Sequence, residues 1–330
     1  MRRPDQGDDR PTSDDRRMSG FRQDFDARAR AARNDFEAQI RQRRAEFGAR
    51  NEALTARTGR NLPAAIAIAL AFAVVMLGSL LFYTPSFMVV AAFLLGLGVY
   101  ELASAMRFAG RDVPRIPSVA VAVATVPAAF LGGQVWALFT LLGGVVFISL
   151  WRLVEVAVSR TKPQAASVAR DLTNGLFVQA YVTLLGACVV LLSAQEQGQL
   201  WVVGFILVVV AVDTGAYATG TNLGKHPMAP RISPKKTWEG FGGSVGASII
   251  VGILVTWLML GLPWWTGIIL GVLISGSATL GDLTESMIKR DLGIKDISSF
   301  LPGHGGLLDR IDSILPSAAI AYLMYLVVNH

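Results

Sequence analysis

The sequence predicts an all-α, polytopic integral membrane protein of about nine transmembrane helices, preceded by a hydrophilic N-terminal tail. Hydrophobic residues make up 52% of the 330 residues and charged residues only 16%, whereas soluble domains carry about 25% charged residues. The charges are also unevenly placed, since residues 1–60 hold 15 of the 30 Lys and Arg and 11 of the 24 Asp and Glu. The rest of the chain, residues 61–330, is therefore a candidate multi-span catalytic or transport unit.

The Arg-rich tail, residues 1–60, divides in two. Residues 1–20 are polar and contain Pro, Gly and Ser, which predicts disorder. Residues 21–59 carry apolar side chains at a spacing compatible with one face of a helix: Phe21, Phe25, Phe36, Ile40 and Phe47. Such an amphipathic helix lies on anionic lipid, or it is a solvated helix or an assembly contact, and the sequence leaves both interpretations open.

Nine apolar runs follow the tail. Within the hydrocarbon core the backbone must satisfy its own hydrogen bonds, so runs this apolar are expected to be helices, and a crossing takes about 17 to 20 residues. The candidate spans are 62–83, 85–106, 116–132, 134–151, 173–194, 199–219, 241–261, 263–281 and 313–328.

The basic side chains are segregated along the chain. Every Lys and Arg lies in the tail or in one of four alternate loops, 107–115, 152–172, 220–240 and 282–312, which we call the basic loops. Connections on the other side, such as 193–199, hold none. Because positive charge accumulates on the cytoplasmic side, we expect a plasma-membrane protein whose tail and basic loops face the cytoplasm.

Two stretches at and just before the third basic loop contain residues that could bind a substrate. Asp213 follows the apolar run 201–212, and an ionisable residue at that depth usually has a function; the alternative is an inert helix-end carboxylate paired with a Lys. The loop 226–240 contains three prolines, which prevent a regular helix. Its cations and hydroxyls suit a polyphosphate; they belong to Arg231, Ser233, Lys235, Lys236 and Thr237. Alternatively, the loop merely sets the topology.

The fourth basic loop carries regularly spaced carboxylates. On a helix, Asp282 and Glu285 share a face with Ser286 and Lys289. Further on, Asp309 and Asp312 are three residues apart and also share a face. Hard oxygen ligands with room for phosphate and water are what Mg²⁺ prefers, and carboxylates from two helix ends could hold two ions over a phosphate. The alternative is that these are helix-end charges paired with neighbouring Lys and Arg.

A glycine-rich turn, Gly303–Gly306, lies between these carboxylates and would let backbone N–H groups approach a phosphate closely. His304 could hydrogen-bond a carboxylate or a phosphate oxygen. A zinc site is not expected, because the chain has only three His and one Cys, and Cys188 lies in an apolar run.

Two motifs resemble those of the phosphatidate cytidylyltransferase (CDP-diacylglycerol synthase) family. The first is SMIKRDLGIKDISSFLPGHGGLLDRID, residues 286–312, and the second is DTGAYATGTNLGKHPMAPRISPKKTWEG, residues 213–240. Together they span about 100 residues, with Lys, Arg, Asp, His and Gly in register. The Arg-rich tail departs from the family's core, which leaves regulation or partners open rather than the reaction.

The resemblance implies conversion of CTP and phosphatidate to CDP-diacylglycerol and pyrophosphate, with Mg²⁺ required. The resemblance and the spacing together favour a two-metal site on Asp282 and Asp309, with Asp312 as a further ligand, in which one ion could be monovalent. The expected catalytic residues are Asp282, Asp309, Lys289, Arg310 and His304. The expected substrate-binding residues are Asp213, Arg231, Ser233, Lys235, Lys236, Ser286, Arg290 and Lys295.

Other functions were weighed against this one. A CTP-dependent lipid kinase, or a cytidylyltransferase for another lipid, would share the membrane body, but the intact 286–312 motif argues against both. A secondary transporter usually places ionisable residues near the bilayer midplane, often in repeats, whereas here they gather at the ends of spans. A scaffold acting through the tail is a further alternative. The expected partners are CTP, phosphatidate and membrane lipids, with no nucleic acid, and a homodimer is a candidate assembly.

Overall fold

The structure, a computed structural model, describes residues 62–160, 163–294, 296–298 and 306–329. The chain divides into two units, Met1–Ala67 and Ile68–His330, and the features below belong to the second. The expectations for the tail, for Lys295 and for His304 lie outside the described residues. In chain order the elements are α2 (Leu62–Phe82), α3 (Thr84–Phe108), α4 (Arg115–Val158), α5 (Ala165–Val178), η1 (Gln179–Leu184), α6 (Leu185–Ser193), α7 (Gly198–Leu223), β1 (Pro227–Ala229), β2 (Ser233–Thr237), α8 (Trp238–Leu254), η2 (Val255–Met259), α9 (Trp264–Asp291), α10 (Leu308–Ile311) and α11 (Ile314–Asn329).

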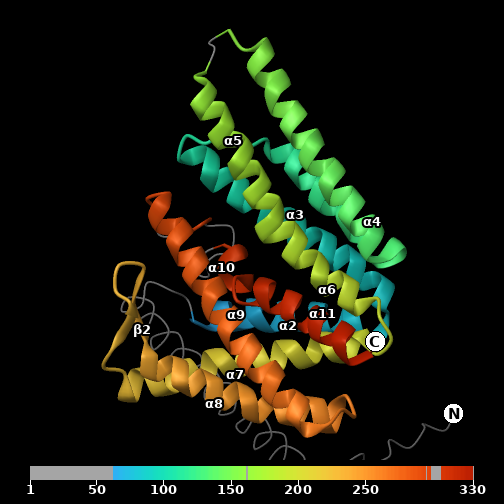
Figure 1. Cartoon of the computed structure of the whole chain (residues 1–330), viewed down its shortest axis with the longest axis vertical. Coiled ribbons are helices and arrows are strands. Elements are labelled where there is room, and N and C mark those ends of the chain that lie inside the picture. The colour runs from blue at the N-terminus through green and yellow to red at the C-terminus, as the bar shows by residue number, and fades with distance from the viewer. Residues whose placement is uncertain (1–61, 161–162, 295, 299–305, 330) are drawn as a thin grey trace, which may run out of the picture. The chain divides into compact units, whose positions relative to one another are not determined.

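Long apolar helices make up most of the membrane unit (Figure 1). Within the described residues, six helical segments have the length and composition needed to cross a membrane: Pro85–Phe108, Arg115–Val158, Ala165–Ser193, Gly198–Leu223, Trp238–Met259 and Trp264–Asp291. Helix α11 and the second half of α2 are shorter apolar helices. The protein is therefore an all-α, polytopic integral membrane protein, as the sequence predicts.

Helix α4 is interrupted at one residue. Gly133 has φ 69° and ψ −164°, a conformation that is essentially restricted to glycine. It divides the 44 residues of α4 into two helical stretches, and these correspond to the expected spans 116–132 and 134–151. The number of crossings, nine, stays a prediction.

Helices α7, α8 and α9 pack through glycine. A Cβ at Gly271 of α9 would stand 2.6 Å from the carbonyl oxygen of Ser248 in α8, and a Cβ at Gly215 of α7 would stand 2.7 Å from that of Gly243. Small residues let helix backbones approach closely in a membrane protein. The close packing brings the ends of the three helices together, and the β1–β2 hairpin joins α7 to α8 there (Figure 1).

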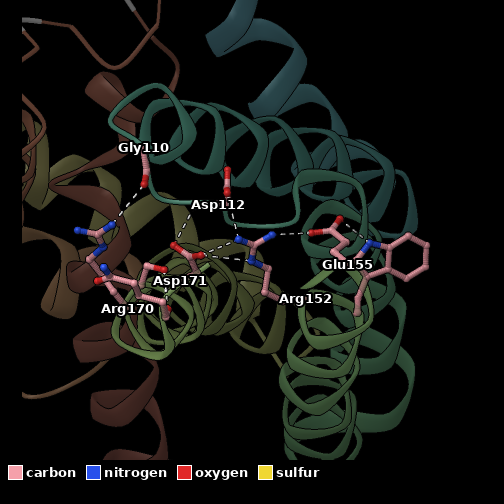
Figure 2. A network of polar contacts seen from close by, with 9 residues as sticks. Gly110, Asp112, Arg152, Glu155, Arg170 and Asp171 are labelled. Atoms are coloured by element: carbon pink, nitrogen blue, oxygen red, sulfur yellow. Dashed lines mark hydrogen bonds and ion pairs between the residues drawn. The ribbon is translucent and has the colours of Figure 1, made fainter. Parts of the chain in front are cut away.

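Two of the basic loops meet around Arg152, near the end of α4 (Figure 2). Its guanidinium is 2.8 Å from Asp171 of α5, 3.0 Å from Asp112 and 3.2 Å from Glu155. Arg152 and Asp171 are buried, and buried charges are tolerated when they are paired and hydrogen-bonded. This cluster therefore joins loop 107–115 to loop 152–172.

The contacts continue to the other two basic loops. Arg111 pairs with Asp291 at the end of α9 at 2.5 Å, and Arg290 Nε donates to the carbonyl oxygen of Ile232, in the hairpin, at 3.5 Å. All four basic loops are thus linked by polar contacts at one end of the helices. This is the arrangement expected for loops on the same side of a membrane.

Candidate active site

The last two turns of α9 present a polar face. Buried positions continue along α9 through Gly281, Glu285 and Ile288. The spacing of the polar residues that follow Gly281 predicts that they share one face of the helix. In the structure Ser286 Oγ is 3.5 Å from Asp282 Oδ1, and Lys289 Nζ is 2.7 Å from Glu285 Oε2. The expected face therefore forms, and it carries two carboxylates at the end of the helix that meets the hairpin.

Three carboxylates converge here in an acidic cluster formed by Asp282, Glu285 and Asp312. One oxygen from each lies within 4.8 Å of the others. Asp312 reaches the cluster because Gly281 has no Cβ; one there would collide with the carbonyl oxygen of Asp312. Burial, and then the negative charge of Asp282, raises the pKa of the Asp312 carboxyl to about 7. Three carboxylates this close are stable together only if a proton or a cation reduces their repulsion.

Glu285 has a free acceptor in this cluster. Its side chain is 2% exposed, and Oε2 pairs with Lys289. No donor among the described residues reaches the buried Oε1. An unsatisfied buried oxygen is costly, and one that lies beside two further carboxylates suits a hard divalent cation with oxygen ligands. The residues present therefore fit Mg²⁺.

Asp309 lies next to the acidic cluster. Its Oδ2 accepts from the Gly306 N–H at 2.9 Å, and its Oδ1 is 3.3 Å from Lys289 Nζ. Lys289 thus bridges Asp309 and Glu285. The structure brings the expected ligands Asp282 and Asp312 into one cluster with Glu285, which is not among the expected ligands, and sets Asp309 next to it.

The hairpin brings Lys236 to Asp282, with which its ammonium group forms an ion pair. The base of the hairpin is held by the start of α8, where Gly240 N–H donates to the Thr237 hydroxyl at 3.1 Å, the usual role of an N-cap residue. Glu239 accepts from the backbone N–H groups of Lys225 and His226, at 3.1 and 3.2 Å. The K-K-T-W-E-G stretch therefore has a local structural role as well as a cationic one.

A cavity of about 360 Å³ opens between α7, β2, α8 and α9, and we call it the first cavity. Its charged groups come from Asp213, Lys235, Lys236 and Asp282, and Ser233 and Thr237 are also in its wall. Apolar residues in its wall are Val212, Met228, Phe241 and Ala278. The first cavity can therefore take a ligand that has both charged and apolar parts.

A second cavity of about 340 Å³ also borders β2. Lys289, Arg290 and Ser286 line it from α9. Ser233 and Lys235 line both cavities. The hairpin strand β2 is thus a shared wall, and donors on it can contact groups in either cavity.

The remaining expected residues lie apart from these walls. Arg231 is exposed in the turn of the hairpin and Arg310 is exposed on α10, and neither lines a described cavity. Two residues near the site were not singled out by the sequence, Glu285 as a ligand and Glu101 of α3. A signal existed for each, because Glu285 shares the Asp282 face and Glu101 is an ionisable residue within an apolar run, as Asp213 is.

The whole membrane unit matches one protein family. The model of the cytidylyltransferase family covers residues 59–328. The chain belongs to the cytidylyltransferase family. Among the relatives of this cytidylyltransferase, a Mycobacterium bovis protein named phosphatidate cytidylyltransferase is 39% identical over 275 residues, which is 82% of this chain and 90% of the relative.

Two further relatives carry the same name. The Mycobacterium leprae protein is 38% identical over 278 residues, which is 82% of this chain and 89% of the relative. A Synechocystis protein is 51% identical over 114 residues, 34% of this chain and 38% of the relative. The cytidylyltransferase is accordingly an enzyme of the nucleotidyltransferase class, and its family places it in phospholipid biosynthesis.

Proposed function

We propose that this enzyme is a phosphatidate cytidylyltransferase, which forms CDP-diacylglycerol and pyrophosphate from CTP and phosphatidate with Mg²⁺. The observation that carries the proposal is the acidic cluster of Asp282, Glu285 and Asp312. Asp282 itself lines the first cavity, and Lys289, which pairs with Glu285, lines the second. Candidate metal ligands beside two cavities that both contain lysine side chains suit the joining of two phosphates. The names of the relatives supply the nucleotide and the lipid.

The reaction needs two phosphates side by side. An oxygen of the phosphatidate phosphate attacks the α-phosphorus of CTP, the bond from that phosphorus to the α–β bridging oxygen breaks, and its electrons leave with pyrophosphate. Ser233 and Lys235 line both cavities, so phosphates in the two cavities would share these donors and lie adjacent, and this positioning contributes strongly to rate. The apolar residues in the wall of the first cavity suit the glycerol and acyl portion of a lipid.

No general base is required in this scheme. A phosphate monoester has a second pKa of about 6, so the attacking oxygen is already ionised near neutral pH. The chain's contribution is positioning and neutralisation of charge, as in other phosphoryl transfers. Lys289 and Arg290 would stabilise charge that develops on the departing pyrophosphate, and Lys236 would bind the phosphate nearest Asp282.

The acidic cluster would hold Mg²⁺ through Asp282, Glu285 and Asp312, with Asp309 available for a second ion. When bound, the metal would neutralise phosphate oxygens and align them. The cluster's buried, unsatisfied Glu285 Oε1 is the feature that fits this assignment. We further propose that the site faces the cytoplasm, from the distribution of Lys and Arg among the basic loops.

The test is transfer of label from CTP to phosphatidate in detergent micelles. With Mg²⁺, α-³²P from CTP is expected in a chloroform-soluble product, whereas γ-³²P is expected in pyrophosphate. Asp282→Asn is expected to abolish this transfer. Glu196→Gln, which changes an exposed carboxylate in the opposite connection, is the matched control and should retain wild-type activity.

Each alternative gives a different result. A CTP-dependent lipid kinase would place γ-³²P, and not α-³²P, in the lipid. A cytidylyltransferase for another lipid would be inactive with phosphatidate and active with a different phospholipid precursor. A transporter would transfer neither label. Any of these outcomes, or full activity in Asp282→Asn, would overturn the proposal.

A further inference from the structure

Glu101 is a buried carboxylate in the middle of the fold that the catalytic scheme above does not use. It lies on α3, within an apolar helix, and is 2% exposed. Its Oε1 accepts from the Ser298 hydroxyl at 2.5 Å and from the Leu307 N–H at 3.0 Å. Its Oε2 accepts from the Leu308 N–H at 2.9 Å. Both oxygens are therefore satisfied, and by donors some 200 positions away in the chain.

These three donors flank one segment of the chain. Ser298 precedes residues 299–305, and Leu307 and Leu308 follow them. Glu101 thus binds residues on both sides of positions 299–305 and connects them to α3. Hydrogen bonds from N–H and O–H groups to an ionised carboxylate are stronger than neutral ones, and a buried charge without them would be destabilising.

Gly306 is part of the same arrangement. A Cβ at Gly306 would stand 3.0 Å from Glu101 Oε2, 3.2 Å from Ser298 Oγ and 3.3 Å from Asp309 Oδ2. The backbone at Gly306 therefore passes through a space bounded by all three side chains, and its N–H donates to Asp309 Oδ2 at 2.9 Å. Glu101 and Asp309 therefore both lie close to the backbone at Gly306.

The position of this stretch determines where two carboxylates lie. Asp309 directly follows Leu308, which Glu101 binds, and Asp312 is one helical turn further on, in the acidic cluster. Glu101 itself does not belong to that cluster. Since Leu307 and Leu308 are also buried, apolar packing contributes to holding the stretch, but packing is not directional, whereas the hydrogen bonds to Glu101 specify its register.

We propose that Glu101 is a positioning residue for the metal site: it holds the Gly306–Asp312 stretch in register, so that Asp312 and Asp309 face the carboxylates of α9. This proposal rests on the proposed function, because it assumes a divalent cation at the acidic cluster. A residue that acts on ligands through a hydrogen bond typically changes metal affinity or activity by roughly 10- to 100-fold when it is replaced. The effect should therefore appear in the affinity for the metal.

The experiment compares Glu101→Gln with wild type in the purified full chain in detergent. Mn²⁺ replaces Mg²⁺ as the probe, because both accept oxygen ligands, and its binding is followed by electron paramagnetic resonance without any substrate. A glutamine has one acceptor oxygen in place of two and adds an N–H₂ group that faces other donors. We expect the Mn²⁺ dissociation constant, and the Mg²⁺ concentration for half-maximal activity, to rise roughly 10-fold or more.

Two further variants keep the test decisive. Ser298→Ala removes one of the three bonds and is expected to give a smaller shift in the same direction, and Gly306→Ala crowds the same carboxylate and is expected to do likewise. Glu196→Gln is the control and should bind Mn²⁺ as wild type does. If Glu101→Gln does not yield folded protein, Ser298→Ala decides the outcome.

A purely structural role for Glu101 would give a different pattern. It would lower the amount of active enzyme, and so kcat, while leaving the Mn²⁺ dissociation constant and the half-maximal Mg²⁺ concentration at their wild-type values in every folded variant. That pattern would refute the inference. Failure of the proposed function is distinguishable, because the wild-type protein itself would then bind no Mn²⁺ or form no CDP-lipid.

Discussion

Lys289 offers the sharpest test of how the site is held together. Its ammonium group is 2.7 Å from Glu285 Oε2 and 3.3 Å from Asp309 Oδ1. Its side chain is 20% exposed, while that of Glu285 is 2% exposed. Lys289→Met would keep most of the length of the side chain and remove the charge. The buried Glu285 would then lack its cationic partner, and no ammonium group would separate its carboxylate from that of Asp309.

The magnitude follows from burial. Removing one partner of a buried ion pair typically costs about 3–5 kcal/mol, because the other charge is left uncompensated. The lower value is expected here, since Lys289 is partly exposed, and about 3 kcal/mol corresponds to a fall in Tm of roughly 6–12 °C for a unit of this size. A second variant, Lys289→Met with Glu285→Leu, replaces the pair by apolar groups, which is often neutral. The double variant should recover at least half of the fall in Tm that Lys289→Met causes.

The assay is thermal unfolding of purified protein in detergent with EDTA, so that no divalent ion substitutes for the ammonium group. Glu155→Gln is the control, because it removes a more exposed ion pair with Arg152 at 3.2 Å, and such pairs contribute roughly 0–1 kcal/mol. Neither Lys289 variant is expected to transfer cytidylyl groups. A single variant that melts within about 2 °C of wild type, or a double variant less stable than the single one, would refute this reasoning.

Four other changes test separate parts of the structure. Asp312→Asn is expected to raise the Mn²⁺ dissociation constant at least 10-fold by electron paramagnetic resonance, because a charged oxygen ligand is lost, and an unchanged constant would remove Asp312 from the ligand set. Lys236→Met is expected to raise the KM for phosphatidate roughly 10-fold, since a charge-assisted contact to phosphate is lost; an unchanged KM for phosphatidate in steady-state assays would contradict it. Gly281→Ala is expected to lower both Tm and Mn²⁺ affinity, because its Cβ would displace the backbone of Asp312, and wild-type binding in a folded variant would count against that contact. Gly133→Ala is expected to lower stability by about 1–3 kcal/mol through backbone strain with kcat unchanged, as no atom lies within 4 Å of the added Cβ; an unchanged Tm would show that α4 does not need this conformation.

Features that depend on neighbours in the chain were predictable from the sequence. Apolar runs long enough to span a membrane predict helices, because the hydrocarbon core offers no water and the backbone N–H and C=O groups must hydrogen-bond to one another. The face shared by Asp282, Glu285 and Lys289 follows from the 3.6-residue period, and the contacts along α9 agree with it. The break between the third and fourth expected spans lies at Gly133, where the structure has its glycine conformation.

Features that depend on which helices pack together were decided by tertiary structure. The sequence places Asp312 one turn from Asp309, but only the close approach at Gly281 brings Asp312, and not Asp309, into contact distance of both α9 carboxylates. Likewise, the pairing of Lys236 with Asp282 depends on how the hairpin meets α9. Side-chain distances of this kind depend on how two helices are rotated and how far apart they lie, and the periodicity of the sequence specifies neither.

By itself, the sequence therefore determined the helical membrane body, the segregation of its basic loops and the residues from which a phosphate and metal site could be built. The tertiary structure alone decided the membership of the acidic cluster, the two cavities that share β2, and the contact of Glu101 with a stretch some 200 positions later in the chain. The physical reason is that helix formation is governed by local hydrogen bonding and hydropathy, whereas carboxylates from distant segments meet only where glycines let their helices approach.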